Sequence, residues 1–156
     1  MTEVHEILRT EFEALKGELI SKHDELGMRA SGNWANSLQV VATGYKVQIL
    51  QDGQYADHLE EGRRPGNQPP SEIIEKWIKD KGIASRLENG MSVSSLAFII
   101  ARKIARQGWK REKSGGVGLL SKVITPERIQ LIIDKAGESL AGSISADLVT
   151  YLKSLQ

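Results

Sequence analysis

The most informative segment of this chain is YADHLEEGRRPGNQPPSEIIEKWIKDKG, residues Tyr55 to Gly82. Its first part, Tyr55 to Gly62, predicts a turn or two of helix, which the glycine ends in a left-handed conformation. From Arg63 to Pro70, three prolines remove backbone donors and a Gly-Asn pair favours a turn, so regular structure is excluded. Ser71 to Lys81 then repeats apolar residues at helical spacing. The stretch therefore predicts a stiff, basic loop held between two helices.

Before this stretch the sequence predicts a long helix and a β-hairpin. Residues 2–26 place apolar side chains three, four or seven apart, which forms one apolar stripe on a helix. Residues 31–35 contain glycine and asparagine and predict a turn. Apolar and polar residues then alternate from 38 to 49, on either side of a short turn at Gly44 and Tyr45. The decisive stretch therefore follows directly from a small sheet.

After this stretch the sequence predicts a helix, a loop and a short strand. A polar connection from Ala84 to Ser92 leads into a helix that Ser92 or Ser94 caps and Gly108 ends. Trp109 to Gly118 is a basic, glycine-rich loop, and Leu119 to Ile124 is expected to add a short strand. This region is thus expected to leave a helix, pass through a loop and return to the sheet.

The last third of the chain predicts a long helix. Thr125, Pro126 and Glu127 supply a capping hydroxyl, a proline for the first helical position and an acid for the first turn. The helix is expected to run to about Leu155, with a stripe formed by Ile129, Ile133, Ala136, Leu140, Ile144, Leu148, Leu152 and Leu155. The whole pattern predicts one α+β domain over residues 1–156. In it a small antiparallel β-sheet is packed by a long N-terminal helix, two middle helices and a long C-terminal helix.

Composition restricts the class of protein. With 156 residues, 40% hydrophobic and 26% charged, the chain has the size and balance of one globular domain. A net charge of +1 makes no general argument for nucleic acid, and the lack of cysteine excludes disulfides and cysteine-ligated zinc. The acidic N-terminus lacks the basic segment of a signal peptide, and the longest apolar run, Leu96 to Ala101, is far shorter than a membrane span. We therefore expect a protein made in the cytoplasm.

One order of residues in the central stretch resembles a known family. It consists of Tyr55, Ala56, Leu59, Glu60, Gly62, Arg63, Pro65, Pro69, Pro70, Ile74, Trp77, Ile78, Lys81 and Gly82. This order resembles one branch of the tail-completion proteins of tailed phages, small neck proteins of the head–tail connector. The resemblance is close from Tyr55 to Ile83 and looser from Leu38 to Ala105. Many members carry an aromatic residue and Gly-Thr where this chain has Glu61, Gly62 and Arg63.

The resemblance implies a structural function. Copies would form a ring that joins the portal side of the capsid to the tail around the DNA channel. The implied partners are other copies of the chain, other connector and tail proteins, and packaged DNA through non-specific contact. The implied location is the neck of the virion, after synthesis in the host bacterial cytoplasm. No membrane, metal or cofactor is implied.

Two sets of residues are the candidate sites. The first is a protein-contact loop, because a rigid exposed loop loses little entropy on docking; the alternative is a merely structural turn. It consists of Gly62, Arg63, Arg64, Pro65, Gly66, Asn67, Gln68, Pro69 and Pro70. The second is a basic patch that faces DNA or a neighbouring subunit. It consists of Arg102, Lys103, Arg106, Lys110, Arg111 and Lys113.

Uneven charge supports a contact between chains. Residues 1–28 carry seven acidic and three basic side chains, whereas residues 102–113 carry six basic and one acidic. Opposite charge at two ends of a small protein suits contact between copies or with a charged partner. Two ordinary solvated helix faces are the other interpretation.

Candidates for catalysis are few. His58 and Glu61 lie three apart, a spacing that metal sites use, but no third ligand is evident, and a surface or partly packed histidine is the other interpretation. Glu60 and Glu61 are adjacent, a poor geometry for a carboxylate pair. One of them is expected to hold Arg63 or Arg64, and two exposed glutamates are the other interpretation. Residues 113–122 are glycine-rich but lack the Gly-Lys-Ser/Thr of a phosphate loop. The sequence therefore predicts no enzyme and no cofactor.

DNA binding is the alternative function. The patch at residues 102–113 is basic and contains Trp109 as a possible stacking group. However, the two middle helices are separated by about nine residues, whereas a helix-turn-helix uses a turn of three or four. A protein that lines a DNA channel would use the same basic face, so the two hypotheses overlap.

Overall fold

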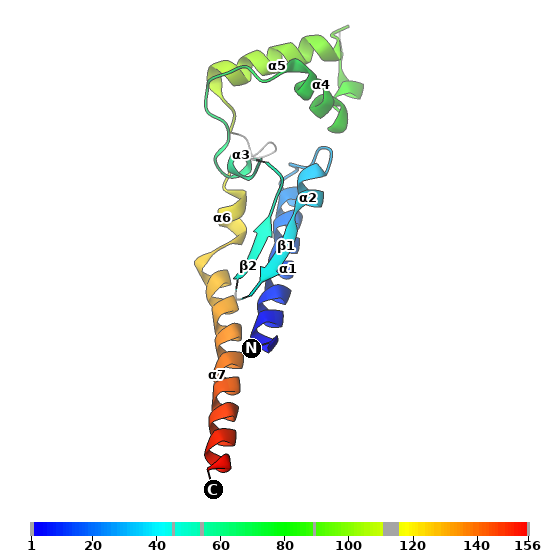
Figure 1. The fold of residues 1–156 in the computed structure, drawn as a ribbon. Helices are drawn as coiled ribbons and strands as arrows, with labels where there is room; N and C mark the ends of the chain where they lie inside the picture. Colours follow the sequence, from blue (N-terminus) through cyan, green and yellow to red (C-terminus); the bar gives the residue numbers. More distant parts are fainter. Residues whose placement is uncertain (1, 45, 54, 89, 111–115, 156) are drawn as a thin grey trace.

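The computed structural model of this chain describes residues 2–44, 46–53, 55–88, 90–110 and 116–155. No helix within these ranges combines the length and hydropathy that a membrane crossing requires. The protein is mostly helical, with one small antiparallel sheet, so the predicted α+β class is confirmed (Figure 1). The elements are α1 (Thr2–Glu25), α2 (Asn33–Ser37), β1 (Gln39–Thr43), β2 (Lys46–Leu50), α3 (Tyr55–Glu61), α4 (Ser71–Asp80), the 3-10 turn η1 (Ala84–Arg86), α5 (Val93–Gln107), α6 (Leu119–Val123) and α7 (Pro126–Ser154).

The N-terminal helix and the hairpin form as predicted. α1 ends before Gly27, whose φ of 67° suits a helix stop. β1 and β2 pair antiparallel from Gln39 opposite Leu50 to Thr43 opposite Lys46. The predicted turn residue Tyr45 lies outside the described residues. The turn expected at residues 31–35 is instead the start of α2, whose Trp34 is buried.

A first hydrophobic core holds the body of the protein, which comprises α1, α2, the hairpin, α3 and α6. Its buried side chains come from segments far apart in sequence: Leu19, Met28, Trp34, Ala35, Leu38, Leu59 and Leu119. The indole Nε1 of Trp34 donates to Gln51 Oε1 at 2.7 Å, so the buried ring satisfies its polar group. This core fixes α3, and hence the start of the predicted contact loop, against the end of α1.

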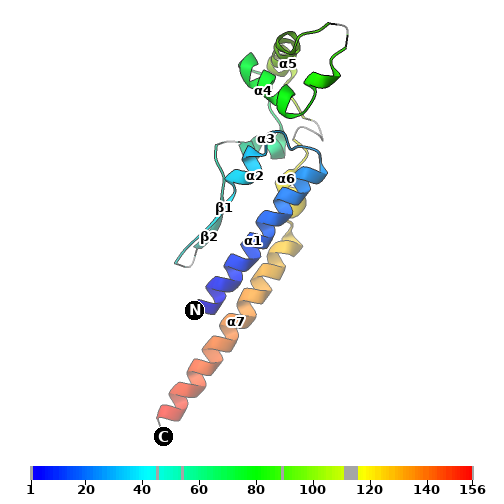
Figure 2. The same cartoon turned by 90° about the vertical axis from the view of Figure 1, so that its right-hand side faces the viewer.

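The two middle helices form a separate lobe, comprising α4, η1 and α5, with its own core. Buried Ile74 and Ile78 of α4 meet buried Ala97 and Ala101 of α5. These alanines let the two helix axes approach closely. The two helices were expected on the sheet, but their apolar faces are buried against each other. Figures 1 and 2 show this lobe at one end of an elongated molecule.

The segment from Leu119 was predicted as a strand, and that prediction is wrong. It forms α6, because the carboxylate of Glu60 accepts hydrogen bonds from the backbone N–H groups of Leu120 at 2.7 Å and Ser121 at 3.2 Å, and from the Ser121 hydroxyl. A carboxylate at these first N–H groups stabilises a helix start. The capping residue lies sixty positions earlier in the chain, so no local sequence pattern predicts that α6 is a helix.

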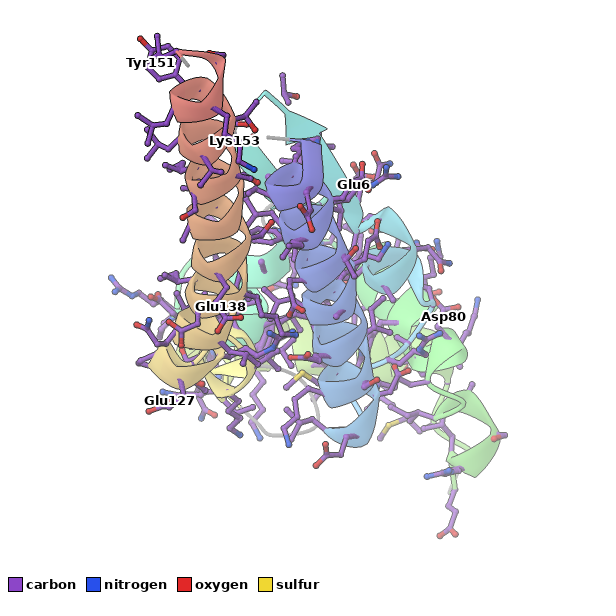
Figure 3. The ribbon with its side chains drawn as sticks, turned by 90° about the horizontal axis from the view of Figure 1, so that it is seen from below. Glu6, Asp80, Glu127, Glu138, Tyr151 and Lys153 are labelled. Carbon is purple, nitrogen blue, oxygen red and sulfur yellow. The ribbon has the colours of Figure 1, made fainter. Side chains whose placement is uncertain are left out.

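α7 lies antiparallel beside α1, as Figure 3 shows from below, and ion pairs join the two helices. Arg128 Nη1 donates to Glu11 at 2.8 Å, and the same guanidinium contacts Glu18 through Nε at 3.1 Å and Nη2 at 2.9 Å. Lys135 makes a second contact with Glu11, which is only 9% exposed. Hydrogen bonds to the carboxylates of Glu18 and Glu11 raise the pKa of Arg128, with the larger contribution from Glu18. Hydrogen bonds from Lys135 and Arg128 lower the pKa of Glu11. Charge pairing thus joins the two long helices.

The second half of α7 extends beyond the body. α1 begins nine residues before Glu11, so the antiparallel α1 ends beside about residue 141 of α7. The remaining residues continue for roughly 20 Å at 1.5 Å per residue. Figures 1 and 2 show this part of α7 passing beyond the N-terminus and the hairpin. The apolar stripe predicted along α7 is therefore left exposed over its second half.

We predict that the Glu11 ion pairs make stability depend on pH. Glu11→Gln should lower the free energy of unfolding at pH 7 by about 2 kcal/mol, the scale of hydrogen bonds to charged groups. Because the folded pKa of Glu11 lies below its ordinary value of 4.5, the stabilisation is present at neutral pH and is lost as the pH falls through the folded pKa. Urea unfolding at pH 7 and at pH 3 should show the wild-type advantage shrinking at the lower pH.

Glu13→Gln is the matched control on the same helix. Glu13 is exposed and pairs with Lys16 at 2.6 Å, a surface contact with little effect on stability. Equal losses for the Glu11 and Glu13 variants would contradict a special contribution from Glu11.

Candidate protein-contact loop

The predicted contact loop is tied to the return strand of chain that follows α5. Arg63 and Trp109 form an isolated antiparallel bridge. The N–H of each donates to the carbonyl of the other, both at 2.8 Å. The chain thus leaves the body at Gly62 and comes back beside the same point after Gly108. The lobe is connected to the body by two backbone segments that are hydrogen-bonded where they cross.

Further hydrogen bonds fix the backbone of the loop, while its outer side chains remain exposed to solvent. The N–H of Gly66 donates to Ala105 O at 2.9 Å, and the guanidinium of Arg63 donates to Asn67 O at 2.9 Å. Pro69 is buried, but residues 64–68 are exposed. The loop is therefore fixed in shape and open to solvent. That combination fits both the contact loop and the structural turn that the sequence left open.

Glycine is required where the two segments cross. Gly62, Gly108 and Gly116 all have positive φ, at 81°, 65° and 78°. A Cβ on Gly108 would lie 2.0 Å from Arg63 O, and one on Gly62 would lie 2.3 Å from Trp109 O. A Cβ on Gly116 would lie 2.7 Å from Gly62 Cα. The segments approach closely only because these three positions carry no side chain.

The acidic residues before the loop do not hold its arginines, so that expectation is wrong. Glu60 caps α6 instead, and Arg63 is satisfied by the carbonyl of Asn67. His58 is half-buried, with its ring centroid 6.1 Å from that of Trp109 and Nδ1 3.4 Å from Gly62 O. It is a partly packed histidine of the crossing. In the described ranges, no group of three or more His, Asp or Glu side chains is arranged to hold a metal ion.

The basic patch lies beside the loop. Arg102, Lys103 and Arg106 are exposed on α5, and Lys110 is exposed just after the bridge. Arg111 and Lys113 lie outside the described residues. Because Gly66 is bonded to Ala105, the exposed loop and the last turn of α5 form one surface that includes Arg64. The sequence suggested two separate sites, and the fold joins their described parts into one.

A hollow that the sequence analysis missed lies between the lobe and the body. Its volume is about 690 Å³. Trp34, Tyr55 and Trp77 line it, together with buried His23, whose ring lies 4.7 Å from that of Trp34. Burial lowers the pKa of His23, so the neutral ring is favoured. No local pattern links these residues, because they come from four separate segments of the chain.

Comparison with known proteins adds no assignment. No protein-family model, curated protein or solved structure matches the chain.

We predict that the crossing tolerates no side chain at Gly108. Gly108→Ala and Gly82→Ala both place a Cβ on a glycine of positive φ at the end of a helix, with φ of 65° and 69°. Each should lose about 1–2 kcal/mol of stability from backbone strain. Only at position 108 does the Cβ also meet a carbonyl oxygen, because nothing lies within 4 Å of the position at Gly82. Gly108→Ala should therefore lose at least about 2 kcal/mol more.

Urea unfolding of the two variants measures this difference directly. Equal losses would mean that the segments at Arg63 and Gly108 can separate without disturbing the fold.

Proposed function

We propose that this chain is a non-enzymatic structural protein of a phage head–tail connector, a tail-completion or neck component. Copies form a ring that joins the portal side of the capsid to the tail around the DNA channel, and the site of action is the neck of the virion. The small sheet with a long helix at each end of the chain is proposed to follow that family's arrangement. The order of residues from Tyr55 to Gly82 supports this proposal.

The observation that carries the proposal is the contact loop. Its backbone is bonded to α5 and to the return segment, while residues 64–68 remain exposed. A surface already fixed in shape loses little conformational entropy when a partner binds. The exposed cations of α5 extend the same surface, so a partner of negative charge is favoured.

We predict that charge reversal in the loop blocks docking without unfolding the protein. Arg64→Glu should weaken binding to the portal and tail assemblies of the same phage by at least tenfold, because it removes a cation from the contact surface and adds a repulsive charge. Arg86→Glu is the matched control, since Arg86 is also an exposed arginine of the lobe and lies on η1. Co-sedimentation with purified portals and tails measures both, and thermal unfolding should be unchanged in both.

Equal binding by the Arg64 and Arg86 variants would remove the loop from the docking surface. Wild-type protein that ignores both portals and tails would overturn the proposed function as a whole.

DNA binding is the second candidate, favoured by the exposure of Arg102, Lys103 and Arg106 along one helix beside the loop. If packaged DNA is the partner, affinity for duplex DNA should fall steeply with salt, because each neutralised phosphate releases counterions. Arg106→Glu should then reduce both the affinity and the salt slope, whereas Lys79→Glu on α4 should change neither. A salt titration of fluorescent duplex binding measures this. Weak binding with a flat salt dependence would leave the patch to a protein neighbour.

A further inference from the structure

The exposed second half of α7 has an apolar, weakly charged surface that resembles a protein–protein interface. Across residues 139–155, the large apolar side chains are between 42% and 65% exposed. Between residues 139 and 152 the only charged side chain is Asp147. Figure 3 shows Tyr151 standing out from the free end of α7, on the side away from α1. A surface this apolar and this weakly charged is typical of an interface.

The stability expected of the projecting half of α7 also indicates an interface. Most of the stability of a helix in a protein comes from packing of its apolar face rather than from its intrinsic propensity. Gly142 weakens the projecting half further, by about 1 kcal/mol relative to alanine. Among the described elements, Figures 1 and 2 show the last part of α7 running clear of the body. The projecting half therefore needs packing from outside the single molecule to be a durable helix.

Its shape favours a second copy of the same helix. Leu140, Ile144, Leu148 and Leu152 lie four residues apart and form one continuous ridge. Over residues 137–145, the rows on either side of the ridge hold small side chains: Gly137, Ala141 and Ser145 on one side, Ser139 and Ser143 on the other. Farther along α7 the same rows continue with Val149 and with Asp147 and Tyr151. Over residues 137–145 a ridge of large residues thus runs beside shallow grooves of the same spacing. The commonest class of helix packing sets such ridges of both helices into each other's grooves, at a crossing of about 50°.

The available area is sufficient for self-association. Leu140, Ile144, Leu148, Val149, Tyr151, Leu152 and Leu155 are each close to half exposed. Burying them would remove about 700 Å² from water on each copy, close to the ~800 Å² that each partner contributes to a stable complex.

We propose that residues 139–155 of α7 are the self-association surface of this protein, with the ridge of one copy seated in the small-residue groove of another. The inference goes beyond the proposed ring, because a surface that packs against its own copy joins molecules in pairs, whereas a ring closes through head-to-tail contacts. It also places self-association at the end of the molecule opposite the contact loop (Figure 1). The loop is thereby left free for a different partner while copies are associated.

The test is sedimentation velocity of the full chain over a range of concentrations. The wild type should associate in the micromolar range, and Leu148→Glu should weaken association at least tenfold because it puts a charge in the middle of the ridge. Thr150→Glu is the matched control, since Thr150 is equally exposed but lies on the opposite side of the helix. Far-ultraviolet circular dichroism at a fixed high concentration reports whether the variants still fold.

A second variant distinguishes specific ridge-in-groove packing from non-specific hydrophobic association. Ala141→Leu with Ser145→Leu fills the groove, adds apolar area and keeps good helix formers. Ridge-in-groove packing predicts weaker association, whereas non-specific adhesion predicts stronger association. Stronger association of this variant would overturn the proposed packing. A wild type that stays monomeric at high micromolar concentration would overturn the self-association surface itself.

Failure here can be told apart from failure of the proposed function. Self-association that depends on Leu148, in a protein that ignores portals and tails, supports this inference and overturns the function. Loop-dependent binding to those assemblies by a protein whose Leu148→Glu variant associates as the wild type does supports the function and overturns this inference.

Discussion

Two backbone segments cross at Arg63 and Trp109, and the arrangement of the whole molecule depends on that crossing. The hydrophobic core of the body and the core of the lobe share no buried residue, so the connection between them governs how they sit. The paired hydrogen bonds between these two residues close the crossing, and the side-chain-free positions Gly62 and Gly108 let the segments approach. Lys81 adds a further tie from the lobe to the carbonyl of Gly27.

The crossing and the projecting helix lie toward opposite ends of the molecule (Figures 1 and 2). One end carries exposed cations on a fixed loop and on α5, and the other carries an apolar ridge with only Asp147 and Lys153 as charged residues between 139 and 155. Polar, charged surfaces favour selective and reversible docking, whereas apolar ridges favour lasting association between identical copies. An elongated protein with unlike ends suits a connecting role, because copies can be joined at one end while a different partner is held at the other.

Local signals predicted most elements correctly, and the exceptions share one cause. Ser92 caps α5 with its side chain at 3.0 Å from the Ser95 N–H, and Thr125 caps α7 at 3.2 Å from the Arg128 N–H. Such signals act over three residues, so sequence alone reveals them. α6 was predicted as a strand because its cap is Glu60, which belongs to another element. The joining of the basic patch to the loop was also not predictable, since it rests on a backbone bond between Gly66 and Ala105.

The sequence alone was sufficient to predict the longer helices and the hairpin, because helical periodicity, caps and turn residues act between near neighbours. It also determined that residues 63–70 form an irregular, basic, proline-bounded loop. Only the tertiary structure decided which apolar stripes are buried. The stripe of α4 meets α5, whereas the similar stripe on the second half of α7 meets nothing within the described chain. Periodicity states that a face is apolar, and only the path of the rest of the chain determines whether that face is covered from within or left for another molecule.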